Sequence, residues 1–131
     1  MIVVDASVLA NVVGDDGPDG RRARQEMRAA GDLAAPDLVD VETVAVLRKR
    51  WLAGMITDAR FAAAIRDLED IEPDRYPTLR FMRRASDLRA NVTPYDTTYV
   101  ALAEVLGCEL WTADHRLAKA PGPACTIRVL I

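Results

Sequence analysis

Residues 1–9 read MIVVDASVL, and this stretch decides the fold. The apolar, largely β-branched run Ile2–Val4 does not alternate with polar side chains, which is typical of a strand buried on both faces. Such strands occur in parallel sheets that are covered by helices on both sides. Asp5 follows the strand directly, so we expect this carboxylate at the carboxyl edge of a parallel sheet, where ligands bind in open α/β folds.

Strands and helices are predicted to alternate along the rest of the chain. Further strands are predicted at 32–35, 91–93, 108–112 and 126–130, and helices at 21–30, 36–51, 57–70, 77–90, 94–106 and 115–120. The prolines at 73 and 77 make 71–77 a connector rather than a continuing helix. This alternation predicts right-handed βαβ units, and 131 residues that are 50% hydrophobic suit a single domain over residues 1–131.

Composition limits the classes of protein that the chain can belong to. No stretch reaches the roughly 20 apolar residues that a membrane helix needs, and the N-terminal segment lacks the features of a signal peptide, so we expect a cytoplasmic protein without membrane contact. Cys108 and Cys125 form no C-x-x-C pair, and His115 is the only histidine. A zinc site is therefore not expected, and both thiols are predicted to be buried and reduced.

The net charge of −3 argues against a protein that binds nucleic acid through bulk electrostatics. A nucleic-acid partner would need local basic clusters, and arginine binds phosphate through a bidentate fork. Solvated helix faces carry the same residues, so both interpretations of these clusters remain open. The clusters are Arg21-Arg22-x-Arg24, Arg48-Lys49-Arg50 and Arg80-x-x-Arg83-Arg84.

Acidic side chains follow several of the predicted strands. Asp5 and Asp114 come just after strands, and Asp96 lies in the first turn of the helix at 94–106, so all three should meet at one sheet edge. Glu42 shares a helical stripe with apolar residues that should face the sheet. Converging carboxylates repel one another, and a hard divalent cation relieves that repulsion. With no histidine or cysteine ligand at hand, Mg²⁺ or Mn²⁺ fits better than Zn²⁺.

Each acid also has a purely structural interpretation. Asp5 and Asp114 could cap the helices that follow them, and Asp96 belongs to a sequence with the form of a capping box. Glu42 could form a buried ion pair or reach solvent past Lys49.

Four segments occur in order along the whole chain: Ile2-Val3-Val4-Asp5-Ala6-Ser7, Ala35-Pro36-Asp37-Leu38-x-x-Val41-Glu42, Val92-Thr93-Pro94-Tyr95-Asp96-x-x-Tyr99-Val100-Ala101-Leu102-Ala103 and Leu110-Trp111-Thr112-Ala113-Asp114-x-x-Leu117. Together they resemble the PIN domain and, within it, the VapC-type toxins of bacterial and archaeal toxin–antitoxin pairs. The resemblance implies a three-layer α/β/α sandwich with a five-stranded parallel sheet. It also implies an endoribonuclease dependent on Mg²⁺ or Mn²⁺, homodimerisation, and inhibition by a small antitoxin protein.

The resemblance assigns roles residue by residue. It places Asp5, Glu42, Asp96 and Asp114 in a catalytic quartet, in which Asp5, Asp96 and Asp114 hold the metal, with Ser7 and Thr112 as accompanying hydroxyls. Arg116 is a candidate contact for a substrate phosphate. The residues after the fourth acid, His115 and Arg116, depart from members with a further Asp or Asn there, so a complete second metal site is not implied. The expected reaction is attack of water on phosphorus, which leaves 5′-phosphate and 3′-hydroxyl ends.

Two other functions fit parts of the sequence. A haloacid-dehalogenase-like phosphatase would use Asp5 as a covalent nucleophile with a nearby lysine, and a PIN-like module could bind RNA or a protein without cleaving it. For the partner, the apolar residues of the helices at 57–70 and 77–90 either all lie in the core or leave a groove that takes an antitoxin helix or a second copy, and the resemblance favours the groove. These residues are Met55, Ile56, Phe61, Ile65, Leu79, Phe81 and Met82.

Overall fold

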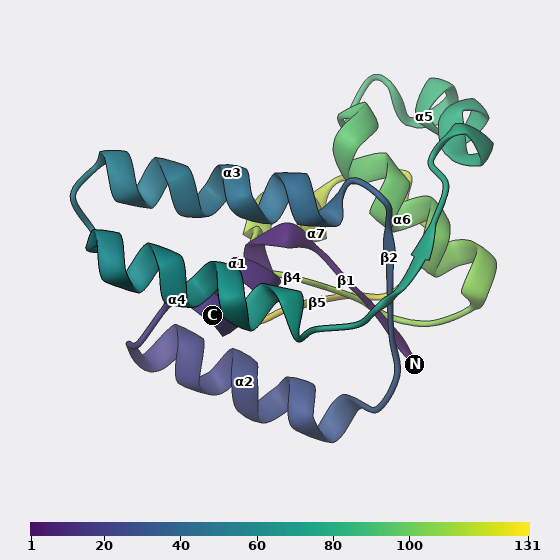
Figure 1. Cartoon of the computed structure of the whole chain (residues 1–131). Coiled ribbons are helices and arrows are strands. Elements are labelled where there is room, and N and C mark those ends of the chain that lie inside the picture. Colours follow the sequence, from purple (N-terminus) through teal and green to yellow (C-terminus); the bar gives the residue numbers. More distant parts are fainter.

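The computed structural model describes residues 1–131 and contains five parallel strands and seven α-helices (Figure 1). The strands are β1 (Ile2–Val4), β2 (Leu33–Pro36), β3 (Asp74–Tyr76), β4 (Leu110–Thr112) and β5 (Ile127–Val129). The helices are α1 (Ala6–Gly14), α2 (Pro18–Ala30), α3 (Val39–Leu52), α4 (Asp58–Glu69), α5 (Met82–Leu88), α6 (Pro94–Leu106) and α7 (His115–Lys119), with a 3-10 turn at Leu79–Phe81. None of the seven helices combines the length and the apolar character that a membrane span requires.

The sheet order is β3-β2-β1-β4-β5, and every neighbouring pair is parallel. The chain moves outward from β1 to β2 and β3 and then crosses back to β4 on the other side of β1. Because the connections are right-handed, this reversal places successive groups of helices on opposite faces of the sheet. The carboxyl ends of β1 and β4 consequently border the crevice in which ligands bind in open α/β sheets.

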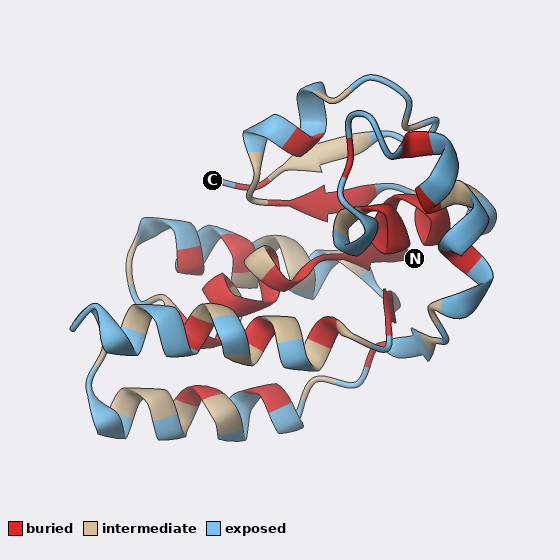
Figure 2. Ribbon diagram, turned by 90° about the horizontal axis from the view of Figure 1, so that it is seen from above, coloured by how far each residue is buried: buried red, intermediate tan, exposed pale blue.

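Two groups of helices cover the sheet. On one side α1 contacts α2, α3 and α4, whereas on the other α6 packs on β1, β2 and β4 with α5 behind it (Figure 1). α7 packs on β4 and β5. Buried residues are concentrated in the central strands and on the inner sides of the helices (Figure 2). The expected three-layer arrangement with a five-stranded parallel sheet is confirmed.

Local sequence signals explain where the helices near the sheet edge begin and end. The hydroxyls of Thr57 and Thr93 accept hydrogen bonds from backbone N–H groups in the first turns of α4 and α6. Gly107 ends α6 in the left-handed conformation, with φ of 64°, which suits a residue without a side chain. These caps fix the register of α6, and therefore the direction in which Asp96 leaves it.

One predicted strand is in the wrong place. Residues 91–93 form a turn before α6, in which Val92 is buried without joining the sheet. The missing strand is β3, inside the predicted connector 71–77, and it pairs with β2 from Ala34↔Asp74 to Pro36↔Tyr76. β3 is a short edge strand with two exposed residues, so it lacks the apolar run that marks a central strand.

Other differences concern helix boundaries and packing. The third helix begins at Val39, because Pro36 still belongs to β2, and the second begins early, at Pro18. The predicted helix at 77–90 is shorter, since a 3-10 turn precedes α5. The predicted groove between α4 and α5 is wrong: α4 packs on α1 and α3, whereas α5 packs on α6 (Figure 1). Cys108 and Cys125 are free, as expected, but half-buried rather than buried.

Candidate active site

All four predicted acids line one cavity of about 410 Å³ at the carboxyl edge of the sheet. Asp5 precedes α1, Glu42 lies on α3, Asp96 lies on α6, and Asp114 precedes α7. Residues separated by as many as 109 positions are thus brought to one place by four different elements. The other lining residues are Ala6, Ser7, Ala45, Val46, Arg48, Lys49 and Tyr99.

Asp5 is the most deeply buried of the four acids, with a relative exposure of 6%. One carboxylate oxygen accepts hydrogen bonds from the backbone N–H groups of Ser7 (3.0 Å) and Val8 (3.2 Å) and from the Ser7 hydroxyl (2.5 Å). The other accepts from the Thr112 hydroxyl at 2.5 Å. Asp5 therefore caps α1 and faces the cavity at the same time, so the capping and functional interpretations are compatible for this residue.

The two predicted hydroxyls join the ends of β1 and β4. The Ser7 hydroxyl also accepts from the backbone N–H of Ala113 at 2.9 Å, and that of Thr112 accepts from the N–H of Asp114 at 3.0 Å. Each hydroxyl donates its proton to Asp5 and accepts from a backbone group near Asp114. Ser7 and Thr112 thereby hold Asp5 and Asp114 in a fixed relation at the cavity wall.

Glu42 has a partner that sequence reasoning missed. The hydroxyl of Tyr99 donates to Glu42 at 2.6 Å, which ties α6 to α3 across the cavity. Tyr99 is only 1% exposed, and a buried tyrosine hydroxyl needs a hydrogen-bond partner. Its spacing of three residues from Asp96, which places both on one helix face, was the available signal. The structure shows no ion pair to Glu42, so that alternative is wrong.

Asp96 and Asp114 complete the acidic lining of the cavity. Asp96 leaves the first turn of α6, whose N-terminus is capped by Thr93 rather than by Asp96 itself. Asp114 caps α7 by accepting from the backbone N–H of Arg116 at 2.8 Å, and the Arg116 guanidinium lies 3.5 Å from the same oxygen. The Arg116 side chain is otherwise exposed and does not line the cavity.

The electrostatics show the mutual repulsion that the sequence predicts. Burial raises the pKa of Asp5 to about 6, although hydrogen bonds from Ser7 and Thr112 favour its charged form. Burial also raises the pKa of Asp96, and the neighbouring charge of Asp114 adds to this. The pKa of Glu42 is raised mainly by burial and further by the charge of Asp96. These acids therefore gain from any positive charge placed in the cavity.

Comparison with known proteins agrees with this geometry. The family model described as the PIN domain matches residues 2–123. The chain belongs to the PIN-domain family. It is 38% identical to VapC ribonuclease Mb0985 of Mycobacterium bovis over 130 residues, covering 99% of this chain and 98% of that protein. It is 36% identical to ribonuclease VapC1 of Mycobacterium tuberculosis, covering 98% of this chain and 96% of that protein.

Solved structures of the family share this fold. VapC20 of M. tuberculosis, described as a toxin that cleaves the sarcin–ricin loop, superposes with a TM-score of 0.71 at 15% identity, covering 91% of this chain and 94% of that one. VapBC2 of Rickettsia felis, solved bound to a DNA fragment from its promoter, gives a TM-score of 0.66 at 9% identity and 98% coverage of both chains. The expected membership among VapC-type PIN ribonucleases is confirmed, and the phosphatase alternative is wrong.

The PIN-domain cavity has the chemistry of a site for a hard divalent cation. Its polar lining consists of carboxylate, hydroxyl and basic groups, without a thiol or an imidazole. No three acidic, histidine or cysteine side chains are arranged so that they alone could hold a metal ion. Mg²⁺ normally keeps several waters and needs only one or two carboxylates. The residues therefore fit a partly hydrated cation.

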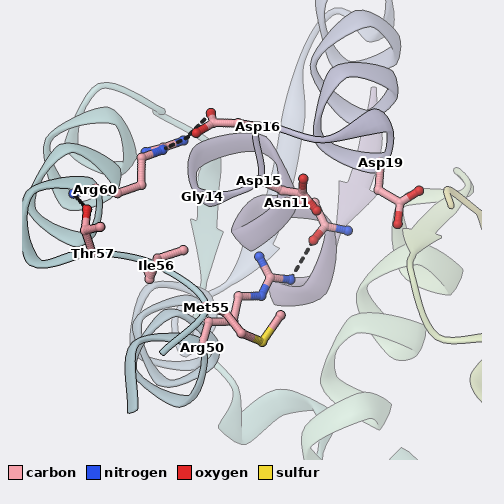
Figure 3. Close-up of a pocket in the computed structure, with 10 residues that line it drawn as sticks. All are labelled: Asn11, Gly14, Asp15, Asp16, Asp19, Arg50, Met55, Ile56, Thr57 and Arg60. Atoms are coloured by element: carbon pink, nitrogen blue, oxygen red, sulfur yellow. Dashed lines mark hydrogen bonds and ion pairs between the residues drawn. The ribbon is translucent and has the colours of Figure 1, made fainter. Parts of the chain in front are cut away.

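The largest cavity of this PIN domain lies elsewhere, around the end of α1 and the turn between α3 and α4 (Figure 3). It measures about 680 Å³, but its two arginines are already engaged. Arg50 donates to the side chain of Asn11 at 2.6 Å, and Arg60 forms a bidentate pair with Asp16 at 2.9 and 3.1 Å (Figure 3). We assign this region to structure rather than to the chemistry of the acids.

Proposed function

We propose that this PIN domain hydrolyses RNA with a divalent metal ion, Mg²⁺ or Mn²⁺, and that it is the toxin of a toxin–antitoxin pair. The observation that carries the proposal is the single cavity lined by Asp5, Glu42, Asp96 and Asp114, at the carboxyl edge of the sheet. The names of its relatives, which are VapC ribonucleases, support the same reaction. A divalent cation bound there would polarise a phosphate oxygen and lower the pKa of a water molecule.

The residues that line or flank the cavity have different roles in the proposed reaction. Asp5, Asp96 and Asp114 would hold the cation together with bound water molecules, not by themselves, with Asp5 fixed in place by Ser7 and Thr112. Glu42, whose carboxylate accepts a hydrogen bond from Tyr99, would accept a proton from water. Arg116 is exposed beside Asp114 and free to turn toward a substrate phosphate.

Metal-dependent cleavage is the direct test. We expect the purified chain to cut single-stranded RNA in millimolar Mg²⁺ or Mn²⁺ and to lose all cleavage when the metal is chelated, with recovery when metal is added back. Products should carry 5′-phosphate and 3′-hydroxyl ends, which can be read from end-labelling reactions. Cleavage that persists in chelator would contradict the assignment of the acids, and binding without cleavage would favour an RNA-binding module.

We further propose a homodimer that is kept inactive by a cognate antitoxin. The solved structures of VapBC2 from R. felis and of a complex from Klebsiella pneumoniae that is described as a toxin–antitoxin complex support such a partner. Leu79 is 82% exposed and Met82 is 38% exposed, so apolar surface remains available beside α5. A basic side chain of the partner could enter the acidic cavity and neutralise it in place of metal.

Both halves of the partner proposal can be measured. Light scattering on the isolated chain should give twice the mass of 14.4 kDa, and adding the antitoxin encoded beside it should abolish RNA cleavage. A strict monomer would remove the first half. Undiminished cleavage in the complex would remove the second.

A further inference from the structure

The basic residues that cluster in the sequence make different contacts in the structure. Arg24 donates to backbone carbonyls, Arg84 pairs with Glu104, and Arg50 is tied to Asn11 (Figure 3). Arg48 and Lys49 are exposed and form neither an ion pair nor a hydrogen bond, which is also true of Arg80 and Arg83. Unlike Arg80 and Arg83, Arg48 and Lys49 line the acidic cavity, and they are the only basic residues in its lining.

A second, smaller cavity adjoins the acidic cavity at Arg48. It measures about 380 Å³ and is lined by Arg48, Trp51, Asp58 and Phe61, so Arg48 borders both cavities. The indole N–H of Trp51 donates to Asp58 at 2.7 Å, and the ring lies 6.3 Å from that of Phe61. Trp51 is nevertheless 42% exposed. The surface thus presents a large aromatic ring that is held from two sides and remains open to solvent.

These features match the needs of a single-stranded RNA substrate. Such strands are bound by a basic groove that follows the backbone and by aromatic rings on which bases stack. An acidic cavity repels phosphates, so free cations beside it are needed to bring the backbone in. Along α3 the distance from Glu42 to Trp51 is about 13 Å, at 1.5 Å per residue, which is a span of a few nucleotides. The carboxylate of Asp58 next to the indole favours a base over a phosphate there.

We propose that Arg48, Lys49 and Trp51 form a nucleotide subsite along α3. Arg48 and Lys49 contact the RNA backbone as it leaves the acidic cavity, and a base stacks on the indole of Trp51. This inference rests on the proposed ribonuclease function and names how that function holds its substrate. It also assigns the exposed indole to RNA rather than to a protein partner.

The test separates binding from cleavage. A short single-stranded RNA is titrated into the full-length chain carrying Asp96→Asn, in chelator, and affinity is compared for added substitutions. We expect Trp51→Leu to weaken binding about tenfold, because stacking on an aromatic ring contributes that much per base, while Trp51→Phe retains most of the affinity. Lys49→Ala should lower the slope of log affinity against log salt by about 0.7. Arg66→Ala is the matched control, since Arg66 is exposed, unpaired and outside both cavities.

Intrinsic fluorescence gives an independent readout. Trp111, the only other tryptophan, is buried, so RNA should quench the emission of Trp51 and the quench should disappear in Trp51→Leu. Unchanged affinity and quench in this variant would overturn the subsite, even if the native chain cleaves RNA. A change in oligomer mass or antitoxin binding without a change in RNA affinity would overturn it in favour of a protein-docking surface. Loss of affinity in these variants supports the subsite even if the native chain fails to cleave, which is a failure of the proposed function alone.

Discussion

Replacing Asp96 by Asn is expected to reduce RNA cleavage by at least a hundredfold while the protein stays folded. The substitution keeps the size of the side chain but removes a negative charge from a cavity whose acids already repel one another. Because the helix is capped by Thr93, and not by Asp96, the fold does not depend on this carboxylate. Without that charge the cavity holds a divalent cation poorly, and the cation is what activates water and phosphate.

The matched control is Asp67→Asn, which changes an exposed acid on α4 that does not line the acidic cavity. Cleavage rates are compared at saturating Mg²⁺, and circular dichroism confirms that both variants are folded. We expect the same loss for Asp114→Asn, since asparagine can cap α7 as well as aspartate does. Glu42→Gln should also lose most of the activity. If the variants unfold and activity follows the remaining folded fraction, the acids are structural caps.

The convergence of the acids could be predicted because it follows from a parallel sheet. Asp5 and Asp114 each come after an apolar strand, and all parallel strands end at one edge. The misplaced strand at 91–93 did not alter the prediction for Asp96, because Thr93 and Pro94 still mark the start of its helix at the same edge. Signals that lie within a few residues of the acid were thus sufficient to place it.

Features that depend on pairs of distant elements could not be predicted. The spacing from Asp96 puts Tyr99 on the same face of α6, but its hydrogen bond to Glu42 also depends on how α6 faces α3, which no local pattern contains. The same holds for Arg48 and Arg50, which are two residues apart on one helix. Arg50 donates a hydrogen bond to the backbone of α1, whereas Arg48 borders the acidic cavity. Only the packing of α3 against its neighbours determines which of the two side chains reaches the cavity. The edge strand β3 was missed because its polar residues are those of a connector.

Without metal, Asp5→Asn is expected to stabilise the folded protein at pH 7.5, although it removes activity. Burial raises the pKa of Asp5 from its usual 3.8 to about 6, so the folded chain holds this proton more tightly than the unfolded chain does. Between these two pH values the folded state binds more protons, and stability therefore falls as the pH rises through this window. At neutral pH the charged carboxylate costs about 3 kcal/mol, at 1.36 kcal/mol per pKa unit.

Asparagine avoids that cost and keeps much of the hydrogen bonding. Its carbonyl oxygen can still accept from the backbone N–H groups of Ser7 and Val8, and its amide can donate to the hydroxyl of Thr112. Asp5→Ala is the control, because alanine loses these bonds and should destabilise the protein at every pH. Melting temperatures are measured in chelator, where we expect Asp5→Asn to melt about 5 to 10 °C above the native chain at pH 7.5.

The dependence of the stability difference on pH and on Mg²⁺ identifies the cause of the higher stability of Asp5→Asn. The difference between Asp5→Asn and the native chain should shrink as the pH falls from 6 and approach zero only well below 3.8, where the aspartate is protonated in both states. It should also shrink when millimolar Mg²⁺ is added at pH 7.5, because the cation stabilises only the chain that keeps the charge. If the native chain is more stable than Asp5→Asn in chelator at pH 7.5, the hydrogen bonds from Ser7 and Thr112 stabilise the charged carboxylate by more than its burial destabilises it. The cavity would then be built around a charged Asp5 before any cation arrives.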